Sequence, residues 1–159
     1  MTVADELVAL LVARGLTVAT AESLTGGAVC AELVSVPGAS AVVRGGVVAY
    51  AADVKRDALG VPEALIASVG TVDAAVARAM AEGVRERLGA DVGLATTGNA
   101  GPDPSEGKPV GRVHVAMATA SGTEDWVLDL EGDRPTIRRS TVDVLLSQAL
   151  ARLAGPAGA

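Results

Sequence analysis

The sequence predicts a single α/β domain in which a mixed sheet is covered by helices on both faces. Strand and helix patterns alternate through the first part of the chain, which is typical of parallel strands joined by helical crossovers. Two adjacent strand patterns later in the chain indicate an antiparallel hairpin. The chain has 159 residues, 50% hydrophobic and 20% charged, which is enough for one buried core.

Six segments have the composition and spacing of helices: residues 5–14, 27–35, 53–59, 62–68, 72–88 and 133–153. Gly15 and Gly60 suit the C-terminal ends of the first and third. Pro62 fits the first turn of the fourth. The fifth is the clearest, because its apolar residues recur at the helical period along its whole length.

Five segments have strand patterns: residues 16–21, 45–50, 91–97, 112–119 and 124–130. The second is rich in valine and is entered through two glycines. The last two flank Ser121-Gly122, as expected for a hairpin turn. The tail over 155–159 is rich in glycine, proline and alanine and is expected to be frayed.

The composition argues against several classes of function. A net charge of −6 does not suit a protein that binds nucleic-acid backbones, and the only aromatic residues, Tyr50 and Trp126, could stack few bases. A small anionic ligand still fits, because a local pocket can be positive on a negative surface. Cys30 has no cysteine partner for a disulfide, and without a Cys or His cluster no zinc site is expected.

The sequence predicts neither a signal peptide nor a membrane segment. The N-terminus lacks a basic start, and no apolar run reaches about 18 residues without a charge or a glycine. We therefore expect a cytoplasmic protein with no membrane partner.

The turn that carries Ser23 is the first candidate site. A β-branched strand runs into Thr25-Gly26-Gly27, which opens a helix. Backbone N–H groups at a helix start can bind phosphate or hold an oxyanion, and a serine beside them is well placed as a nucleophile. The alternative is that Ser23 caps the helix, although Thr25 would serve equally well.

Lys55 and Tyr50 offer a way to activate that serine. Tyr50 ends a predicted strand, where α/β proteins bind ligands. Lys55 falls in the first turn of the next helix, where the macrodipole disfavours a positive charge, and partial burial there would lower the pKa of its amine. A lysine of lowered pKa can act as a general base. The alternative is an ion pair with Asp53 or Asp57 on a solvated face.

Other residues give weaker indications. The glycines of the loop 97–102 would let a ligand approach the backbone, although such loops are common connections. Three arginines near the start of the last helix could meet a phosphate or could be surface charge: Arg134, Arg138 and Arg139. His114 alternates with valines and is expected to face solvent or to be hydrogen-bonded, and Cys30 is expected to be a small buried hydrophobic residue.

Taken together, these segments resemble the CinA C-terminal domain family, the nicotinamide-nucleotide amidases. The matching strings are Ala21-Glu-Ser-Leu-Thr-Gly-Gly27, Val36-Pro-Gly-Ala-Ser40, Gly45-Gly-Val-Val-Ala-Tyr50 with Lys55, Leu59-Gly-Val61, Thr97-Gly-Asn-Ala-Gly-Pro102, Lys108-Pro-Val-Gly111 and Gly132-Asp-Arg134. They occur in the family's order and cover nearly the whole chain.

The resemblance implies a three-layer α/β/α fold over residues 1–154 that hydrolyses the carboxamide of nicotinamide mononucleotide, in pyridine-nucleotide salvage. It implies Ser23, Tyr50 and Lys55 as the catalytic residues, and no metal or other cofactor is expected. Lys55 would accept the serine proton directly or through Tyr50. The expected substrate contacts are Leu24, Thr25, Gly26, Gly27, Gly98, Asn99, Ala100, Gly101 and Arg134.

The larger members carry an extra N-terminal domain, and this chain resembles the stand-alone form. It departs from many relatives at Leu24, where they have cysteine, at Ala51-Ala52, where they have Ser-Asn, and at Asn99, where an apolar residue is common. The alternative function is a non-catalytic nucleotide-binding or partner-binding module linked to competence or DNA damage. The Val- and Ala-rich surfaces favour a homo-oligomer.

Overall fold

The core of the protein is a five-stranded mixed sheet. In the computed structural model, which describes residues 1–156, the strands are β1 (Val18–Glu22), β2 (Val43–Val48), β3 (Val92–Gly98), β4 (Arg112–Thr119) and β5 (Gly122–Asp129). Their order in the sheet is β2-β1-β3-β4-β5. Both neighbours of β1 run parallel to it, whereas β4 is antiparallel to β3 and to β5. The mixed sheet and the late hairpin are thus confirmed.

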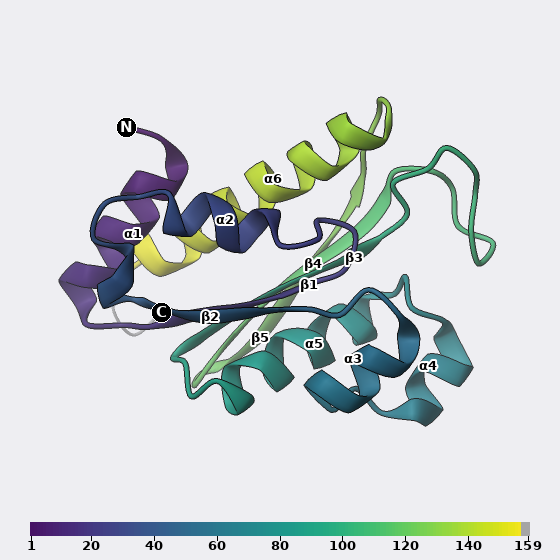
Figure 1. The fold of residues 1–159 in the computed structure, drawn as a ribbon, viewed down its shortest axis with the longest axis horizontal. Helices are drawn as coiled ribbons and strands as arrows, with labels where there is room; N and C mark the ends of the chain where they lie inside the picture. The colour runs from purple at the N-terminus through teal and green to yellow at the C-terminus, as the bar shows by residue number, and fades with distance from the viewer. Residues whose placement is uncertain (157–159) are drawn as a thin grey trace.

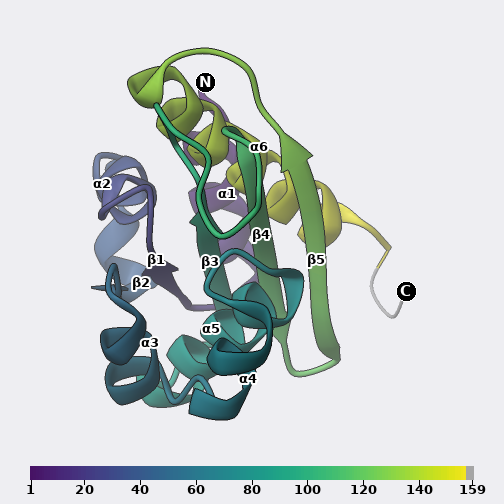
Figure 2. The same cartoon turned by 90° about the vertical axis from the view of Figure 1, so that its right-hand side faces the viewer.

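Helices cover both faces of this sheet (Figures 1 and 2). One face carries α1 (Val3–Arg14), α2 (Ala28–Val34) and α6 (Arg134–Ala154). The other carries α3 (Ala52–Leu59), α4 (Glu63–Val69) and α5 (Ala74–Arg87). A single 3-10 turn, η1 (Ala39–Ala41), precedes β2. The three-layer α/β/α architecture and the single α/β domain are confirmed.

Alternating side chains on β4 divide the core into two halves. Val113, Val115 and Met117 belong to the large cluster beneath α1 and α6. Ala116 and Ala118 belong to the alanine-rich cluster beneath α5. Small residues allow α5 to lie close to its neighbours, because a Cβ added at Gly83 would overlap the backbone carbonyl of Leu59.

Capping residues explain where the observed elements differ from the predicted ranges. The fifth helix begins at Ala74 rather than at residue 72, because Asp73 accepts a hydrogen bond from the Ala75 N–H and caps it. Thr2 and Asp5 form a capping box that starts the first helix two residues early. The strand predicted over 45–50 is displaced to Val43–Val48, so Tyr50 lies beyond its end. Residues 157–159 of the expected frayed tail lie outside the described residues.

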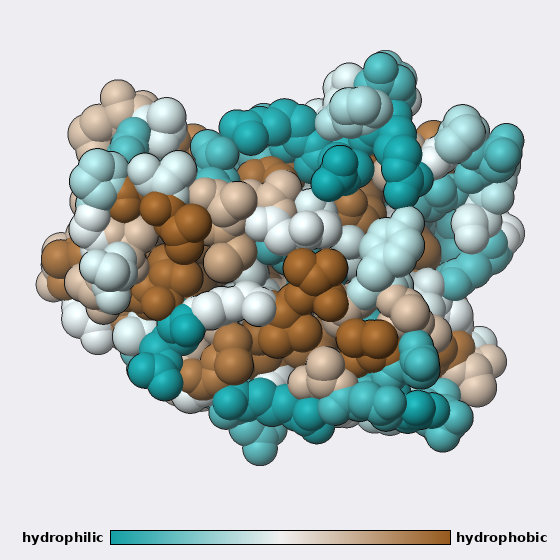
Figure 3. Space-filling view, in the orientation of Figure 1, coloured by the Kyte–Doolittle hydropathy of each residue, from teal (hydrophilic) through white to brown (hydrophobic). Residues whose placement is uncertain are grey.

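The strand β2 is an edge of the sheet, bonded only to β1. Figure 3 shows hydrophobic residues gathered in a band across the face on which this edge lies. Val34 on α2 and Val48 on β2 are among the exposed large hydrophobic residues. This edge therefore combines exposed valines with one exposed charge, Arg44.

Candidate active site

The carboxyl ends of the parallel strands bring several predicted site residues to one cavity. Ser23 follows β1, Tyr50 lies two residues beyond β2, and Gly98 ends β3. The cavity has a volume of about 270 Å³ and is lined by Ser23, Leu24, Tyr50, Thr71, Val72, Gly98, Asn99, Ala100, Ser105 and Arg134. Ligands bind at this position in open α/β sheets. A larger hollow, of about 510 Å³, lies at the other end of the sheet and contains none of the predicted site residues.

Lys55 and Ser23 form a buried pair. The Lys55 side chain is only 1% exposed, and its Nζ lies 2.8 Å from Ser23 Oγ. The other two contacts of Nζ are the backbone carbonyl oxygens of Ala49 and Tyr50, at 2.8 and 2.9 Å. Asp57 instead pairs with Arg56 at 2.7 Å, so the alternative in which Lys55 forms an ion pair on a solvated face is wrong.

Burial explains the electrostatics of this lysine. Removing the amine from water disfavours its charged form and lowers the pKa of Lys55 to about 8, against an opposing attraction from the Glu106 carboxylate. A neutral amine has two N–H donors and one lone pair. In the structure Nζ donates to Ser23 Oγ and to the carbonyls of Ala49 and Tyr50, which matches the three donors of a charged lysine. When the amine is neutral, the two carbonyls can accept both N–H groups and the lone pair can face the Ser23 hydroxyl. The same contacts therefore serve both protonation states.

Ser23 does not cap the helix α2, which contradicts the alternative role. The cap position is Gly27, and it makes no side-chain capping bond. Thr25 is not the cap either, because its hydroxyl donates to Glu22 at 2.6 Å and meets Thr96 Oγ1 at 2.8 Å. The only side-chain partner of Ser23 Oγ within residues 1–156 is Lys55.

Glu22 performs the capping, and the sequence analysis did not single it out. Its carboxylate is 1% exposed and accepts hydrogen bonds from the N–H groups of Val29 and Cys30 at 2.8 and 3.0 Å. The expected anion site at this helix start is thus filled by the protein's own carboxylate. The available signal was a charged residue beside a strand that is otherwise apolar, which is rare unless the charge is paired.

The turn between β1 and α2 still has free backbone donors. The Gly26 N–H donates to the Ser23 carbonyl at 3.1 Å. Within residues 1–156, the N–H groups of Leu24, Thr25 and Gly27 donate to no acceptor. Gly26 and Gly27 have φ values of 60° and 102°, in the left-handed region that glycine adopts without strain. Of these three residues with unpaired donors, only Leu24 lines the cavity together with Ser23, whereas Thr25, Gly26 and Gly27 do not line it.

Within residues 1–156 the Tyr50 hydroxyl makes no hydrogen bond to Ser23 or Lys55. The side chain is 62% exposed, and its hydroxyl accepts a hydrogen bond from Arg134 Nη2 at 3.0 Å. Arg134 Nη1 also donates to the Gly101 carbonyl at 2.7 Å. Of the Tyr50 atoms, it is the backbone carbonyl oxygen that contacts Lys55. The structure therefore brings Tyr50 and Arg134 together at the cavity mouth.

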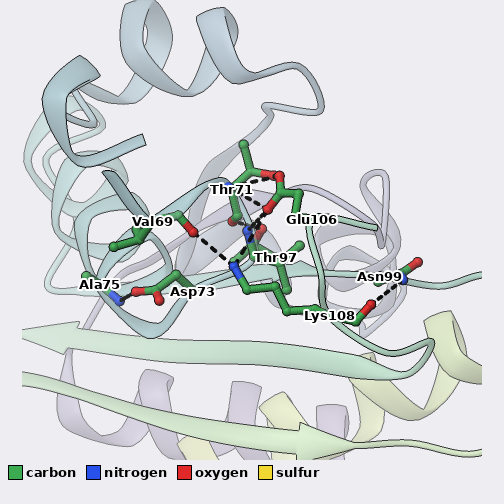
Figure 4. A network of polar contacts seen from close by, with 9 residues as sticks. Val69, Thr71, Asp73, Ala75, Thr97, Asn99, Glu106 and Lys108 are labelled. Carbon is green, nitrogen blue, oxygen red and sulfur yellow. Dashed lines mark hydrogen bonds and ion pairs between the residues drawn. The ribbon is translucent and has the colours of Figure 1, made fainter. Parts of the chain in front are cut away.

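A polar network fixes the opposite wall of the cavity (Figure 4). The Glu106 carboxylate accepts hydrogen bonds from the hydroxyl and N–H of Thr71 and from the Val72 N–H, at 2.7–3.1 Å. Lys108 Nζ donates to the Val69 carbonyl at 2.9 Å. Thr71, Val72 and Ser105 line the cavity in addition to the predicted residues, and the sequence carried no motif that marks them.

The comparison with known proteins establishes the family. The model of the CinA C-terminal domain matches residues 1–153. The chain belongs to the CinA C-terminal domain family. It is 53% identical to a CinA-like protein of Frankia casuarinae over 92% of this chain and 34% of that protein. It is also 53% identical to a CinA-like protein of Anaeromyxobacter dehalogenans, over 85% of this chain and 33% of that protein. The chain thus spans about a third of the length of the curated relatives that it matches.

Solved CinA structures share the whole fold. A CinA superfamily protein from Klebsiella pneumoniae superposes with a TM-score of 0.93 at 30% identity, covering 96% of each chain. A competence/damage inducible protein from Agrobacterium tumefaciens gives a TM-score of 0.88 at 36% identity and covers 98% of each chain.

The departures of this CinA domain have local structural effects. The Asn99 amide is engaged inside its own loop, where Nδ2 donates to the Asp103 carbonyl at 3.1 Å and Oδ1 accepts from the Gly101 N–H at 2.9 Å. Ala51 is the cap residue of α3 and provides no side-chain capping bond. Leu24 is buried within the turn between β1 and α2.

Three further predicted residues have structural surroundings of their own. His114 is only 9% exposed, burial lowers the pKa of its imidazole, and Nδ1 has no hydrogen-bond partner within residues 1–156. The expectation of a solvent-facing or hydrogen-bonded histidine is therefore wrong. His114 shares a face of β4 with Ala116, and that face is covered by α5. Cys30 is half-buried rather than buried, and Arg139 pairs with Glu32 on the surface at 3.3 Å.

No site for a metal ion was found in the part of the chain that the structure describes, where no three His, Cys, Asp or Glu side chains are grouped to bind one. Over the same residues, no helix combines the length and the apolar character needed to cross a membrane.

Proposed function

We propose that this protein is an amidohydrolase that converts nicotinamide mononucleotide to nicotinate mononucleotide and ammonia. The observation that carries the proposal is the buried Lys55 Nζ, 2.8 Å from Ser23 Oγ, with carbonyl oxygens as its only other partners within residues 1–156. A binding module has no need for a lysine whose pKa is lowered next to a serine. Perturbed groups of this kind are concentrated at catalytic sites.

The first half of the proposed reaction forms an acyl-enzyme. Neutral Lys55 accepts the Ser23 hydroxyl proton, and Oγ attacks the carboxamide carbon of the substrate. The unpaired N–H group of Leu24, a residue that lines the cavity, stabilises the oxyanion, an effect worth about 3–4 kcal/mol per donor in other hydrolases. Lys55 then passes the proton to the departing nitrogen, and ammonia leaves.

The second half releases the product. Water occupies the place of ammonia, Lys55 accepts one of its protons, and the hydroxide attacks the acyl carbon. Collapse of the oxyanion breaks the bond to Oγ, which recovers its proton from Lys55. The product is a carboxylic acid, which loses its proton to solvent to become the carboxylate, and the net change before that ionisation is one water consumed and one ammonia released.

Tyr50 and Arg134 bind substrate in this proposal rather than transfer protons. Arg134 lies at the cavity mouth with a guanidinium suited to a phosphate, and the Tyr50 hydroxyl holds it there. The backbone from Gly98 to Ala100 provides the wall along the sugar. Because Glu22 occupies the start of α2, the phosphate is assigned to Arg134 and not to that helix.

The test is ammonia release from nicotinamide mononucleotide by the purified protein. We expect Ser23→Ala and Lys55→Ala to abolish release. Arg56→Ala is the matched control, because Arg56 neighbours Lys55 on α3 but pairs with Asp57. Equal activity in Lys55→Ala and Arg56→Ala would remove Lys55 from the mechanism.

The second candidate is a non-catalytic nucleotide-binding or partner-binding module linked to competence or DNA damage. It is favoured by the name of the Agrobacterium tumefaciens structure, a competence/damage inducible protein. Absence of ammonia release together with tight binding of the nucleotide in calorimetry would select it.

We also propose that two copies associate through the free edge of β2. Exposed sheet edges are normally protected by charge or proline. On this one Arg44 is the exposed charge of β2, while Val34, Val48 and Tyr50 are exposed on or beside the same edge. Light scattering after size exclusion should give a dimer for the natural protein and a monomer for Val48→Lys. A monomeric natural protein would contradict this.

A further inference from the structure

We propose that Arg138 is a positioning residue for the oxyanion donors beside Ser23. This inference rests on the proposed function for its reaction but concerns a residue that the mechanism above does not use. Arg138 lies on α6, far from Ser23 in the sequence, and its side chain reaches the nucleophile turn. Its Nε donates to the Leu24 carbonyl at 2.8 Å, and its Nη2 donates to the Thr25 carbonyl at 3.1 Å.

These contacts fix the direction of a peptide group that carries an unpaired donor. In a trans peptide the carbonyl and the following N–H point in opposite directions. The Leu24 carbonyl belongs to the same peptide as the Thr25 N–H. Since Arg138 holds that carbonyl, the Thr25 N–H points away from the guanidinium, and it donates to no acceptor within residues 1–156.

The next peptide of the turn is held by the same side chain. The Thr25 carbonyl is also held by Arg138, and the N–H of the same peptide, that of Gly26, closes the turn by donating to the Ser23 carbonyl at 3.1 Å. One side chain thus fixes two consecutive peptides of the turn, directly after Ser23 and Leu24, the two residues of this turn that line the cavity.

The charge of Arg138 acts in the same direction. A positive group on a carbonyl oxygen polarises the peptide and makes its N–H a stronger donor. Arg138 is half-buried and forms no ion pair with a carboxylate among the described residues, so its charge is not offset by a direct partner. The neighbouring Arg139 is the contrast, since it pairs with Glu32 and Asp143 at 3.3 and 3.5 Å.

Acylation of Ser23 by p-nitrophenyl acetate tests this role without the natural substrate. In that step Oγ bonds to the acetyl carbon, the serine proton moves to neutral Lys55, and the ester bond breaks to release 4-nitrophenolate. The rate is measured at pH 9 for the natural protein and for Arg138→Ala, with Arg139→Ala as the matched control and Ser23→Ala as the background.

We expect Arg138→Ala to acylate about 10- to 100-fold more slowly, because a misplaced oxyanion donor loses much of its effect. Arg139→Ala should acylate at the natural rate. The midpoint of the pH profile should remain near that of the natural protein, since Arg138 makes no contact with Lys55. Addition of millimolar guanidinium should restore part of the rate in Arg138→Ala, which a merely structural role of Arg138 would not explain.

Natural acylation rates in a folded Arg138→Ala variant would overturn the proposal, as would an absence of rescue by guanidinium.

If Arg138→Ala does not fold, Arg138→Lys replaces it. Lysine keeps the positive charge but not the planar guanidinium that holds two carbonyl groups at once. We therefore expect a smaller loss of acylation rate than in Arg138→Ala, and an unchanged rate would again overturn the proposal. A natural protein that is acylated at Ser23 but releases no ammonia from nicotinamide mononucleotide would reject the amidase alone. A natural protein whose Ser23 is not acylated would overturn the role of Arg138.

Discussion

The pKa of Lys55 makes a quantitative prediction for the pH dependence of the proposed amidase activity. If neutral Lys55 is the general base, kcat/KM follows the neutral fraction of a group with a pKa of about 8. That fraction is about one in eleven at pH 7 and about ten in eleven at pH 9. We therefore expect kcat/KM to rise about tenfold between these pH values and to level off above them.

The assay is ammonia release under conditions where the substrate itself does not titrate. The second pKa of a phosphate monoester is about 6, so the nucleotide keeps its charge from pH 7 upward. His114→Gln is the control, because burial lowers the pKa of that imidazole below its usual 6.5 and its loss should leave the midpoint unchanged. Glu106→Gln should move the midpoint to lower pH, since this carboxylate favours the charged form of Lys55. A flat profile between pH 7 and 9, or a midpoint that moves with His114, would refute Lys55 as the base.

Three substitutions test other parts of the structure. Tyr50→Phe should change kcat by less than about threefold and raise KM, because the hydroxyl binds Arg134; a hundredfold loss of kcat at constant KM would show proton transfer by the phenol. Glu22→Gln should lower the free energy of unfolding by about 2–3 kcal/mol in urea denaturation, because an amide would face the N–H groups at the α2 start; a loss under about 0.5 kcal/mol would contradict this. Gly83→Ala should destabilise by about 1–3 kcal/mol through its overlap with Leu59, measured in the same way, whereas alanine normally stabilises a helix, and a gain would show that α3 can move aside.

The architecture could be predicted from the sequence because it depends on periodic patterns. The alternation of strands and helices and the late hairpin are properties of local segments, and each was recovered. The boundaries were less accurate where a single side chain decides them. Asp73 shortens α5 by capping it, and the pairing of β2 with β1 displaces that strand from its predicted range.

The candidate site could be predicted only in part. Lys55 was conspicuous because a lysine at a helix start opposes the dipole, and its burial beside Ser23 agrees with that argument. Two of the three partners of Lys55 Nζ are backbone carbonyl oxygens. Because every residue has a backbone carbonyl, the sequence does not reveal these contacts. Glu22 was missed for a similar reason, since its role depends on how the strand before it approaches the helix after it.

The division of the sheet into a parallel and an antiparallel half has a consequence for how this scaffold can change. The candidate site is built by the segments that leave β1, β2 and β3, so variation there changes the lining of its cavity. The hairpin turn between β4 and β5 lies at the opposite end, where Ala118 pairs with Gly93 near the beginning of β3. Insertions, tags or fused domains at Ser121 would therefore leave the candidate site untouched, and that turn is where the molecule can acquire new attachments without altering the cavity.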